Sequence, residues 1–246
     1  MKKMILGPVV FILVLFISTG AGALTINDSG SGAYWGGTIH GITDRDVIGD
    51  GFAVSGLTAT QAGGMTTVIL TGPYFATGYA TGSSPYGNIG DLYISTSGWK
   101  VNSPANNARA DTFAANEGWN YVVSVGQVKV YHLDPSFNIN DIDSGSEGHW
   151  SQYKTGQAYQ GGYDGSPLPG VASRQLNSTL GDLSYLSFTF PDLGNVDEMG
   201  FHWTMACGND VVEGGGTPIP EPATMLLLGS GLIGLAGYGR KKLFKK

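Results

Sequence analysis

Cys207 and His202 are the residues whose types could form a reactive thiol and imidazole pair. In a β-strand, side chains five residues apart point to opposite faces of the sheet. Cys207 shares the apolar face with Trp203 and Met205, whereas His202 shares the other face with Thr204. A reactive cysteine needs an accessible, electropositive site. We therefore expect Cys207 to be a buried structural thiol, and we predict no catalytic residue. As the only cysteine, it also excludes an intrachain disulfide.

Two acidic clusters could hold a hard cation, because carboxylates two residues apart can wrap such an ion with oxygen ligands. They are Asp44–Asp50 and Asp141–Glu147. Neither fits the EF-hand loop, since Ile48 stands where an oxygen ligand is required in the first and the glycine is misplaced in the second. Calcium stays open as the alternative to solvated loop carboxylates, and we expect no other cofactor or metal.

A second candidate chemistry is stacking on sugar rings. Residues 138–170 are polar and glycine-rich, with aromatic side chains set among them: Trp150, Tyr153, Tyr159 and Tyr163. Exposed aromatic rings on polar loops suit glycan binding. The alternative is that these rings cover the edges of a sheet as part of the core.

The charge of the chain limits its partners. Between Leu24 and Thr217 there are six basic and 18 acidic residues, which gives this part of the chain a net charge of −12. The whole chain has a net charge of only −6, because seven basic residues lie near its two ends. Such a surface repels nucleic acid, so nucleic-acid binding is not expected.

The elements that must position these residues are strands. Glycine is abundant, helical periodicity is missing, and short β-branched or aromatic segments alternate with turn residues. The predicted strands are Phe52–Thr58, Thr66–Thr71, Asp91–Thr96, Tyr121–Leu133 with a turn or bulge at Gly126, Tyr185–Phe190 and Gly200–Cys207. In the predicted strand Tyr185–Phe190, the side chains of Leu186, Phe188 and Phe190 should face the core. We predict an all-β domain, a β-sandwich or jelly roll.

The N-terminus has the order of a secretory signal peptide. Two lysines precede an apolar stretch from Met4 to Ile17, and small residues follow. Ala21 and Ala23 provide the small side chains that signal peptidase requires, so we predict a signal helix in residues 1–23 and cleavage after Ala23.

The C-terminus carries a second targeting segment. Pro220, Glu221 and Pro222 follow a Gly/Pro spacer at residues 214–219 and precede the uncharged run Ala223–Tyr238 and a basic end. A 16-residue helix covers about 24 Å, against about 30 Å of hydrocarbon. We predict a single short transmembrane helix whose basic end is cytoplasmic, so that the domain at residues 24–213 is extracellular.

Residues 219–232, from Ile219-Pro220-Glu221-Pro222 through the leucine-rich run, closely resemble the PEP-CTERM sorting signal. The resemblance covers roughly the last 28 residues. It implies that residues 220–246 are the sorting signal, that Pro220, Glu221 and Pro222 are recognised by the membrane enzyme exosortase, and that the tail anchors the protein in the inner membrane only transiently.

Together these observations favour an exported protein of the cell envelope, cell surface or extracellular matrix. We expect a non-enzymatic structural or polysaccharide-interacting protein whose processing partners are signal peptidase and exosortase. Two alternatives stay open, a secreted glycan-active enzyme and a calcium-dependent adhesion module with the same tail. A glycosidase needs two carboxylates about 5 to 9.5 Å apart, and these can come from distant strands.

Overall fold

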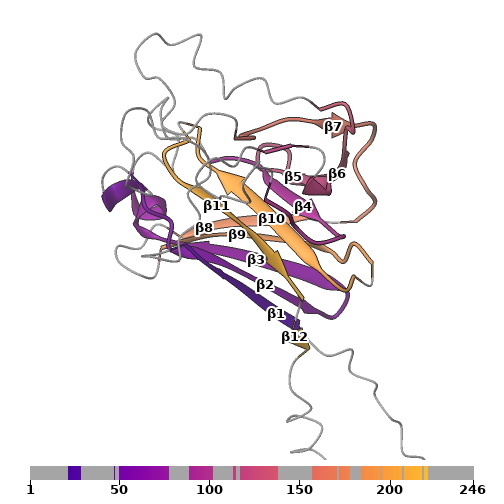
Figure 1. The fold of residues 1–246 in the computed structure, drawn as a ribbon, viewed down its shortest axis with the longest axis horizontal. Coiled ribbons are helices and arrows are strands. Elements are labelled where there is room, and N and C mark those ends of the chain that lie inside the picture. Colours follow the sequence, from indigo (N-terminus) through magenta and orange to yellow (C-terminus); the bar gives the residue numbers. More distant parts are fainter. Residues whose placement is uncertain are drawn as a thin grey trace, which may run out of the picture.

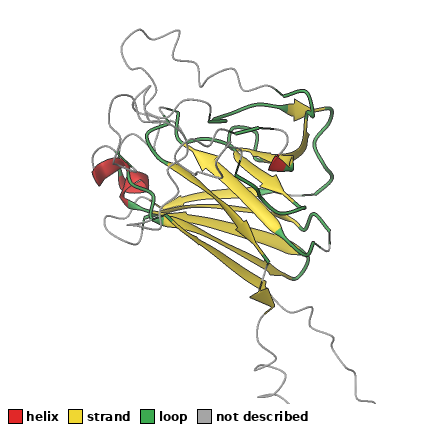
Figure 2. Ribbon diagram, viewed as in Figure 1, coloured by secondary structure: helices red, strands yellow, loops and turns green. Residues whose placement is uncertain are grey.

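The computed structural model describes residues 22–28, 47, 50–77, 89–101, 113–114, 117–137, 157–170, 172–177, 184–194, 196–206, 208–217 and 219–220. These residues form two six-stranded antiparallel sheets with two short 3-10 helices, η2 (Asp50–Phe52) and η3 (Pro73–Ala76). Figure 2 shows strands and loops in nearly all of this part of the chain. The predicted all-β class is confirmed, and the architecture is that of a β-sandwich.

The first sheet has the strand order β12-β1-β2-β3-β9-β8. Its strands are β1 (Gly22–Asn27), β2 (Gly56–Ala62), β3 (Met65–Thr71), β8 (Ser173–Asn177), β9 (Tyr185–Pro191) and β12 (Ile219–Pro220). A two-residue turn joins β2 to β3, and its residues Gly63 and Gly64 have φ angles of 61° and 77°. Positive φ at both positions is what a tight hairpin turn requires, and glycine adopts it without strain.

The second sheet has the order β11-β10-β4-β5-β6-β7. Its strands are β4 (Leu92–Ser95), β5 (Trp119–Ser124), β6 (Lys129–Leu133), β7 (Tyr163–Asp164), β10 (Met199–Thr204) and β11 (Val211–Gly216). Figure 1 shows this sheet lying across the first one. Each sheet therefore mixes early and late parts of the chain, and both terminal regions enter the same fold.

The main core fills the space between the sheets. The first sheet contributes Leu186, Phe188 and Phe190, which have no exposed surface, as the alternation along β9 predicted. The second contributes Trp203 and Met205, also fully buried. Burying a side chain of this size stabilises the fold by about 1.5–3 kcal/mol. The core therefore supplies the main attraction between the two sheets.

A second, smaller cluster covers the opposite face of the second sheet. It contains buried aromatic and aliphatic side chains from β4, β5, β6 and nearby loops: Tyr93, Phe113, Trp119, Val122, Tyr131, Leu133 and Ala158. Because both faces of this sheet are covered, all six residues of β10 are buried. The two faces still differ in polarity, since Met199, Phe201 and Trp203 belong to the main core and His202 packs against the smaller cluster.

Several strand boundaries differ from the sequence prediction. The segment Phe52–Thr58 is not one strand, because η2 ends at Phe52 and β2 begins at Gly56. The predicted strand Tyr121–Leu133 is a hairpin, and its turn at residues 125–128 includes Gly126, as expected. The predicted signal helix over residues 1–23 lies outside the described residues except at Gly22 and Ala23, which belong to β1, and the predicted transmembrane helix Ala223–Tyr238 lies wholly outside them. Within the described ranges, no helix has the length and apolar content needed to cross a bilayer.

Candidate functional site

The two ends of the described chain meet at one edge of the first sheet. β12 pairs with β1 in antiparallel register, so that Gly22 is opposite Pro220 and Ala23 is opposite Ile219. Figure 1 shows β1 and β12 converging at the same end of the sandwich. The predicted signal-peptide cleavage point at Ala23 thus lies beside the start of the predicted sorting motif. Ala21, Glu221 and Pro222 lie outside the described residues.

Glycines bring the preceding strand close to its neighbours. Gly214, Gly215 and Gly216 end β11 and pair with the first half of β10. A Cβ on Gly215 would lie 2.7 Å from the carbonyl oxygen of Met199 and 2.9 Å from the Cβ of Trp99. Such distances leave no room for a larger side chain. The glycine-rich stretch assigned to the spacer therefore begins inside the sheet.

The predicted glycan-stacking residues fall in different environments. Trp150 and Tyr153 lie outside the described residues, and Tyr159 is partly buried. Tyr163 is also partly buried, and its hydroxyl donates a 2.5 Å hydrogen bond to the Asp91 carboxylate. Glycan stacking by these four residues remains a prediction.

Asp91 is the centre of a buried polar network. Its carboxylate accepts hydrogen bonds from the backbone amides of Val125 at 2.7 Å and Gly161 at 3.0 Å, in addition to the one from Tyr163. Burial raises the pKa of Asp91 above its ordinary value, and these hydrogen bonds partly oppose the increase. Burial and the bond to Asp91 also raise the pKa of Tyr163. The network ties β4 to the 125–128 turn and to residues 161–163.

His202 and Glu213 form a second buried polar pair. They are opposite each other on β10 and β11, and the His202 Nδ1 contacts the Glu213 carboxylate. The His202 Nε2 lies 3.0 Å from the carbonyl oxygen of Ala158 and must carry a hydrogen, because a carbonyl only accepts. The indole of Trp99 donates to the other Glu213 oxygen.

This pair is enclosed by aromatic rings. The rings of Tyr93, Phe113 and Trp119 lie 4.9–6.0 Å from the His202 ring, centroid to centroid. His202 has no exposed surface and Glu213 is 2% exposed. The arrangement stabilises the sheet and leaves no space for a substrate. The sequence predicted that His202 and Trp203 lie on opposite faces, and the structure confirms this. The sequence did not indicate Glu213, because the pairing of β10 with β11 across the 205–210 turn is what brings it to His202. Cys207 lies outside the described residues.

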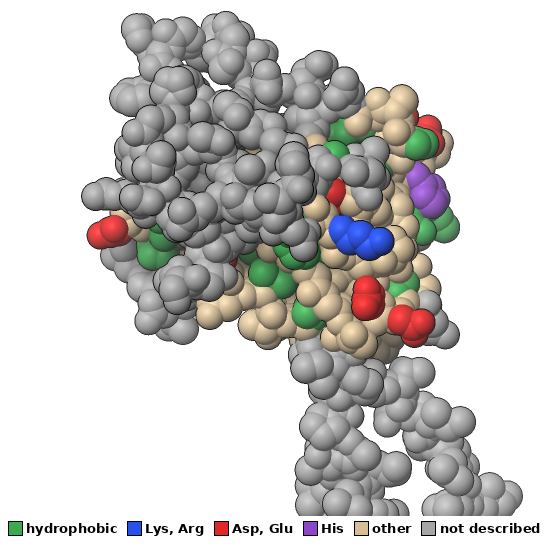
Figure 3. All heavy atoms as spheres, in the orientation of Figure 1, with side chains coloured by type: hydrophobic (Ala, Val, Ile, Leu, Met, Phe, Trp, Pro, Cys, Tyr) green, Lys and Arg blue, Asp and Glu red, His purple; other side chains and the backbone are tan. Residues whose placement is uncertain are grey.

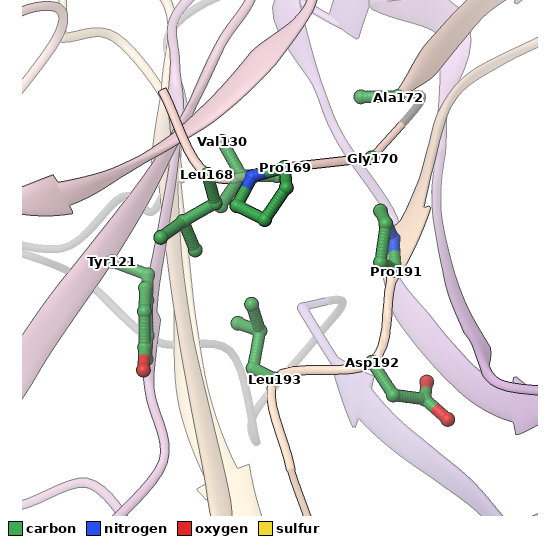
Figure 4. Close-up of a pocket in the computed structure, with 9 residues that line it drawn as sticks. All are labelled: Tyr121, Val130, Leu168, Pro169, Gly170, Ala172, Pro191, Asp192 and Leu193. Atoms are coloured by element: carbon green, nitrogen blue, oxygen red, sulfur yellow. The ribbon is translucent and has the colours of Figure 1, made fainter. Parts of the chain in front are cut away.

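A cleft opens at the edge of the sandwich, between the inner face of β5 and β6 and the segments that flank β8 and β9. Its volume is about 260 Å³. Figure 4 shows the lining side chains, which are mostly apolar: Tyr121, Val130, Leu168, Pro169, Gly170, Ala172, Pro191, Asp192 and Leu193. The sequence did not indicate this cleft, because its walls come from four separate stretches of chain.

The surface offers no basic patch in the part of the chain that the structure describes. There the cations are Lys100, Lys129 and Arg174, and they lie on separate elements. Figure 3 shows acidic side chains at several places on one face. The predicted acidic clusters lie mostly or wholly outside the described residues. Among the described side chains, no group of three or more His, Cys, Asp or Glu is placed to hold a metal ion.

The described chain is an all-β domain, and its last strand leads into the predicted C-terminal targeting segment. A family model for the PEP-CTERM protein-sorting motif matches residues 218–241. The chain is therefore a PEP-CTERM sorting domain-containing protein, and this motif implies export toward the cell envelope by exosortase-type sorting. Neither a curated protein nor a solved structure matches the chain.

Proposed function

We propose that this protein is a non-enzymatic surface or matrix protein that is anchored briefly in the inner membrane, cut by exosortase and then held by extracellular polysaccharide. The PEP-CTERM motif at residues 218–241 carries the sorting part of the proposal. The arrangement of the domain supports the transient anchoring. The side chains that are left uncommitted at the surface support the polysaccharide part.

The pairing of β1 with β12 suits a precursor with a membrane segment at each end. Gly22 and Pro220 are opposite each other, so their Cα atoms are about 4.5–5.5 Å apart in an antiparallel pair. Both flanking segments can therefore enter one bilayer from the same end of the domain. A domain with its ends on opposite sides would need an additional linker to reach the membrane twice.

The hydrogen bonds of three buried carboxylates support a non-enzymatic role. Asp91, Asp210 and Glu213 are each at most 2% exposed. Asp91 and Asp210 accept hydrogen bonds from backbone amides, and Glu213 binds His202 and Trp99. Glycoside hydrolysis requires a carboxylate pair that faces a substrate. These three instead satisfy donors inside the fold, which favours a binding or structural protein.

The sorting step is tested by the intact mass of the protein isolated from its native envelope and growth medium. A variant with alanine at positions 220, 221 and 222 serves as the comparison. We expect the native protein to begin at Leu24 and to lack the tail, whereas the variant keeps its tail. An identical, uncut tail in both proteins would contradict exosortase processing and leave a simple C-terminal anchor.

A further inference from the structure

The cleft beside β5 and β6 has one aromatic wall. Tyr121 lines it and is partly buried, and in Figure 4 its ring is seen edge-on, with a face turned toward the space near Leu168 and Leu193. His132, opposite Tyr121 on the neighbouring strand, is exposed. The two ring centroids are 4.9 Å apart with an interplanar angle of 34°. At this separation and tilt the two rings overlap, so His132 packs against the Tyr121 ring and supports it at the mouth of the cleft.

The hydroxyl of Tyr121 is the polar group of this cleft that the fold leaves without a hydrogen bond among the described residues. Neither the Tyr121 hydroxyl nor the His132 imidazole makes a hydrogen bond with the described residues. The Asp192 carboxylate accepts a 2.7 Å hydrogen bond from the Thr66 hydroxyl, and in Figure 4 it points away from the space between Tyr121 and Leu193. Elsewhere, Tyr93, Tyr131 and Tyr163 all donate hydrogen bonds through their hydroxyls. Unused hydrogen-bonding capacity beside an apolar wall is characteristic of ligand sites.

We propose that this cleft is a saccharide-binding site that takes a neutral pyranose unit of extracellular polysaccharide. The C–H face of such a ring packs on Tyr121 and the proline and leucine walls, while its hydroxyls bond to the Tyr121 hydroxyl. His132 acts through its packing against the Tyr121 ring. The volume of about 260 Å³ lies just below the range of drug-sized pockets and suits a single sugar unit. This inference rests on the proposed function and identifies the binding site for it.

Charge selects a neutral sugar over an acidic one. None of the nine lining residues is Lys or Arg, and the one charged side chain among them is the Asp192 carboxylate. An anionic sugar would lose water from its charge without gaining a cation partner, and it would lie near the negative charge of Asp192. A neutral sugar has no charge to desolvate, and its hydroxyls can bond to the Tyr121 hydroxyl.

Binding is tested by affinity electrophoresis of the processed protein, purified from the envelope. One set of gels contains the neutral fraction of the producing bacterium's extracellular polysaccharide, and a second set contains the acidic fraction. Tyr121→Leu keeps apolar contact with the core but loses the ring, and His132→Ala changes an exposed residue. Tyr185→Ala is the matched control, because Tyr185 is a partly buried tyrosine on the outward-facing side of β9. Thermal melts establish that each variant is folded.

We expect the neutral polysaccharide to retard the native protein and the Tyr185 variant equally. Tyr121→Leu should weaken the apparent affinity about tenfold, and His132→Ala should weaken it less. Full retardation of both cleft variants would overturn the site while leaving polysaccharide binding intact. A native protein that only acidic polysaccharide retards would overturn the neutral ligand. A native protein that neither fraction retards would overturn the polysaccharide part of the proposed function as well, whereas sorting is judged separately by intact mass.

Discussion

The buried polar networks and the edge cleft use the same residue types in opposite ways. In the networks, Asp91 bonds to Tyr163 and Glu213 bonds to His202, away from solvent. At the cleft, Tyr121 lines an open space, and its hydroxyl and the imidazole of the adjacent His132 make no hydrogen bond with the described residues. Buried polar groups must be satisfied or they cost stability. The comparison separates side chains that hold the sheets together from side chains that remain available to a ligand.

The largest effect should come from breaking a buried pair. Glu213→Ala leaves His202 and the Trp99 indole without their carboxylate partner inside the fold. We expect it to lower the free energy of unfolding by about 3–5 kcal/mol. Chemical denaturation measures this loss. The exposed Glu198 is the matched control, and Glu198→Ala should change stability little. Similar losses in both variants would contradict a structural role specific to Glu213.

Asp91 should make stability depend on pH in a defined direction. Burial raises the pKa of Asp91 in the folded state above its ordinary value, so the folded protein holds the proton where the unfolded chain releases it. The contribution of this group is therefore fully present below the ordinary pKa of aspartate and is lost as pH rises through the raised value.

Asp91→Asn should remove this loss of stability with rising pH. Denaturation of the native protein and the variant across the acidic range gives the difference in unfolding free energy at each pH. We expect that difference to change just above the ordinary aspartate pKa of 3.8 and then to level off. Parallel profiles over the whole range would show that Asp91 titrates alike in the folded and unfolded states.

Two tyrosine hydroxyls, one bonded and one without a described partner, should differ in their effect on stability. Tyr163→Phe removes a donor from Asp91 and should destabilise the fold by about 1 kcal/mol, a value reduced because Tyr163 is only partly buried. Tyr121→Phe removes a hydroxyl that no described group uses, so the melting temperature should not change. Equal shifts for the two variants would contradict the distinction between committed and uncommitted hydroxyls.

The smallest effect concerns the edge where the ends meet. A chain that begins at Leu24 lacks Gly22 and Ala23, which are the pairing partners of β12. We expect hydrogen exchange at the Ile219 amide to become faster, while amides in the β10 and β11 pair, such as Val212, keep their protection. Unchanged exchange at Ile219 would indicate that pairing with β1 does not protect this segment.

Local patterns in the sequence predicted those parts of the fold that depend on alternation and turns. β9 was predicted because Leu186, Phe188 and Phe190 alternate with polar residues. The turn between β5 and β6 was predicted because the apolar positions change from odd to even residue numbers near Gly126. β8 was missed because a polar, exposed edge strand, Ser173–Asn177, carries only one apolar residue, Leu176. β1 was missed because Gly22–Asn27 includes the end of the predicted signal peptide.

The site depends on long-range pairing that no local pattern contains. Tyr121 and His132 are neighbours through strand register, whereas Pro191 and Leu168 reach the same cleft from other segments. The sorting motif is the opposite case, since Pro220, Glu221 and Pro222 are contiguous and could be found from sequence alone. A motif of adjacent residues can be recognised in the sequence, whereas a cleft built from separate segments is found only in the structure.

Co-sedimentation measures whether extracellular polysaccharide retains the mature domain. The processed protein is mixed with the neutral fraction of the polysaccharide from the producing bacterium, and the polymer is collected by ultracentrifugation. We expect the protein to sediment with the polymer and to stay in solution without it. Protein that remains in the supernatant at every polymer concentration would rule out retention by this polysaccharide.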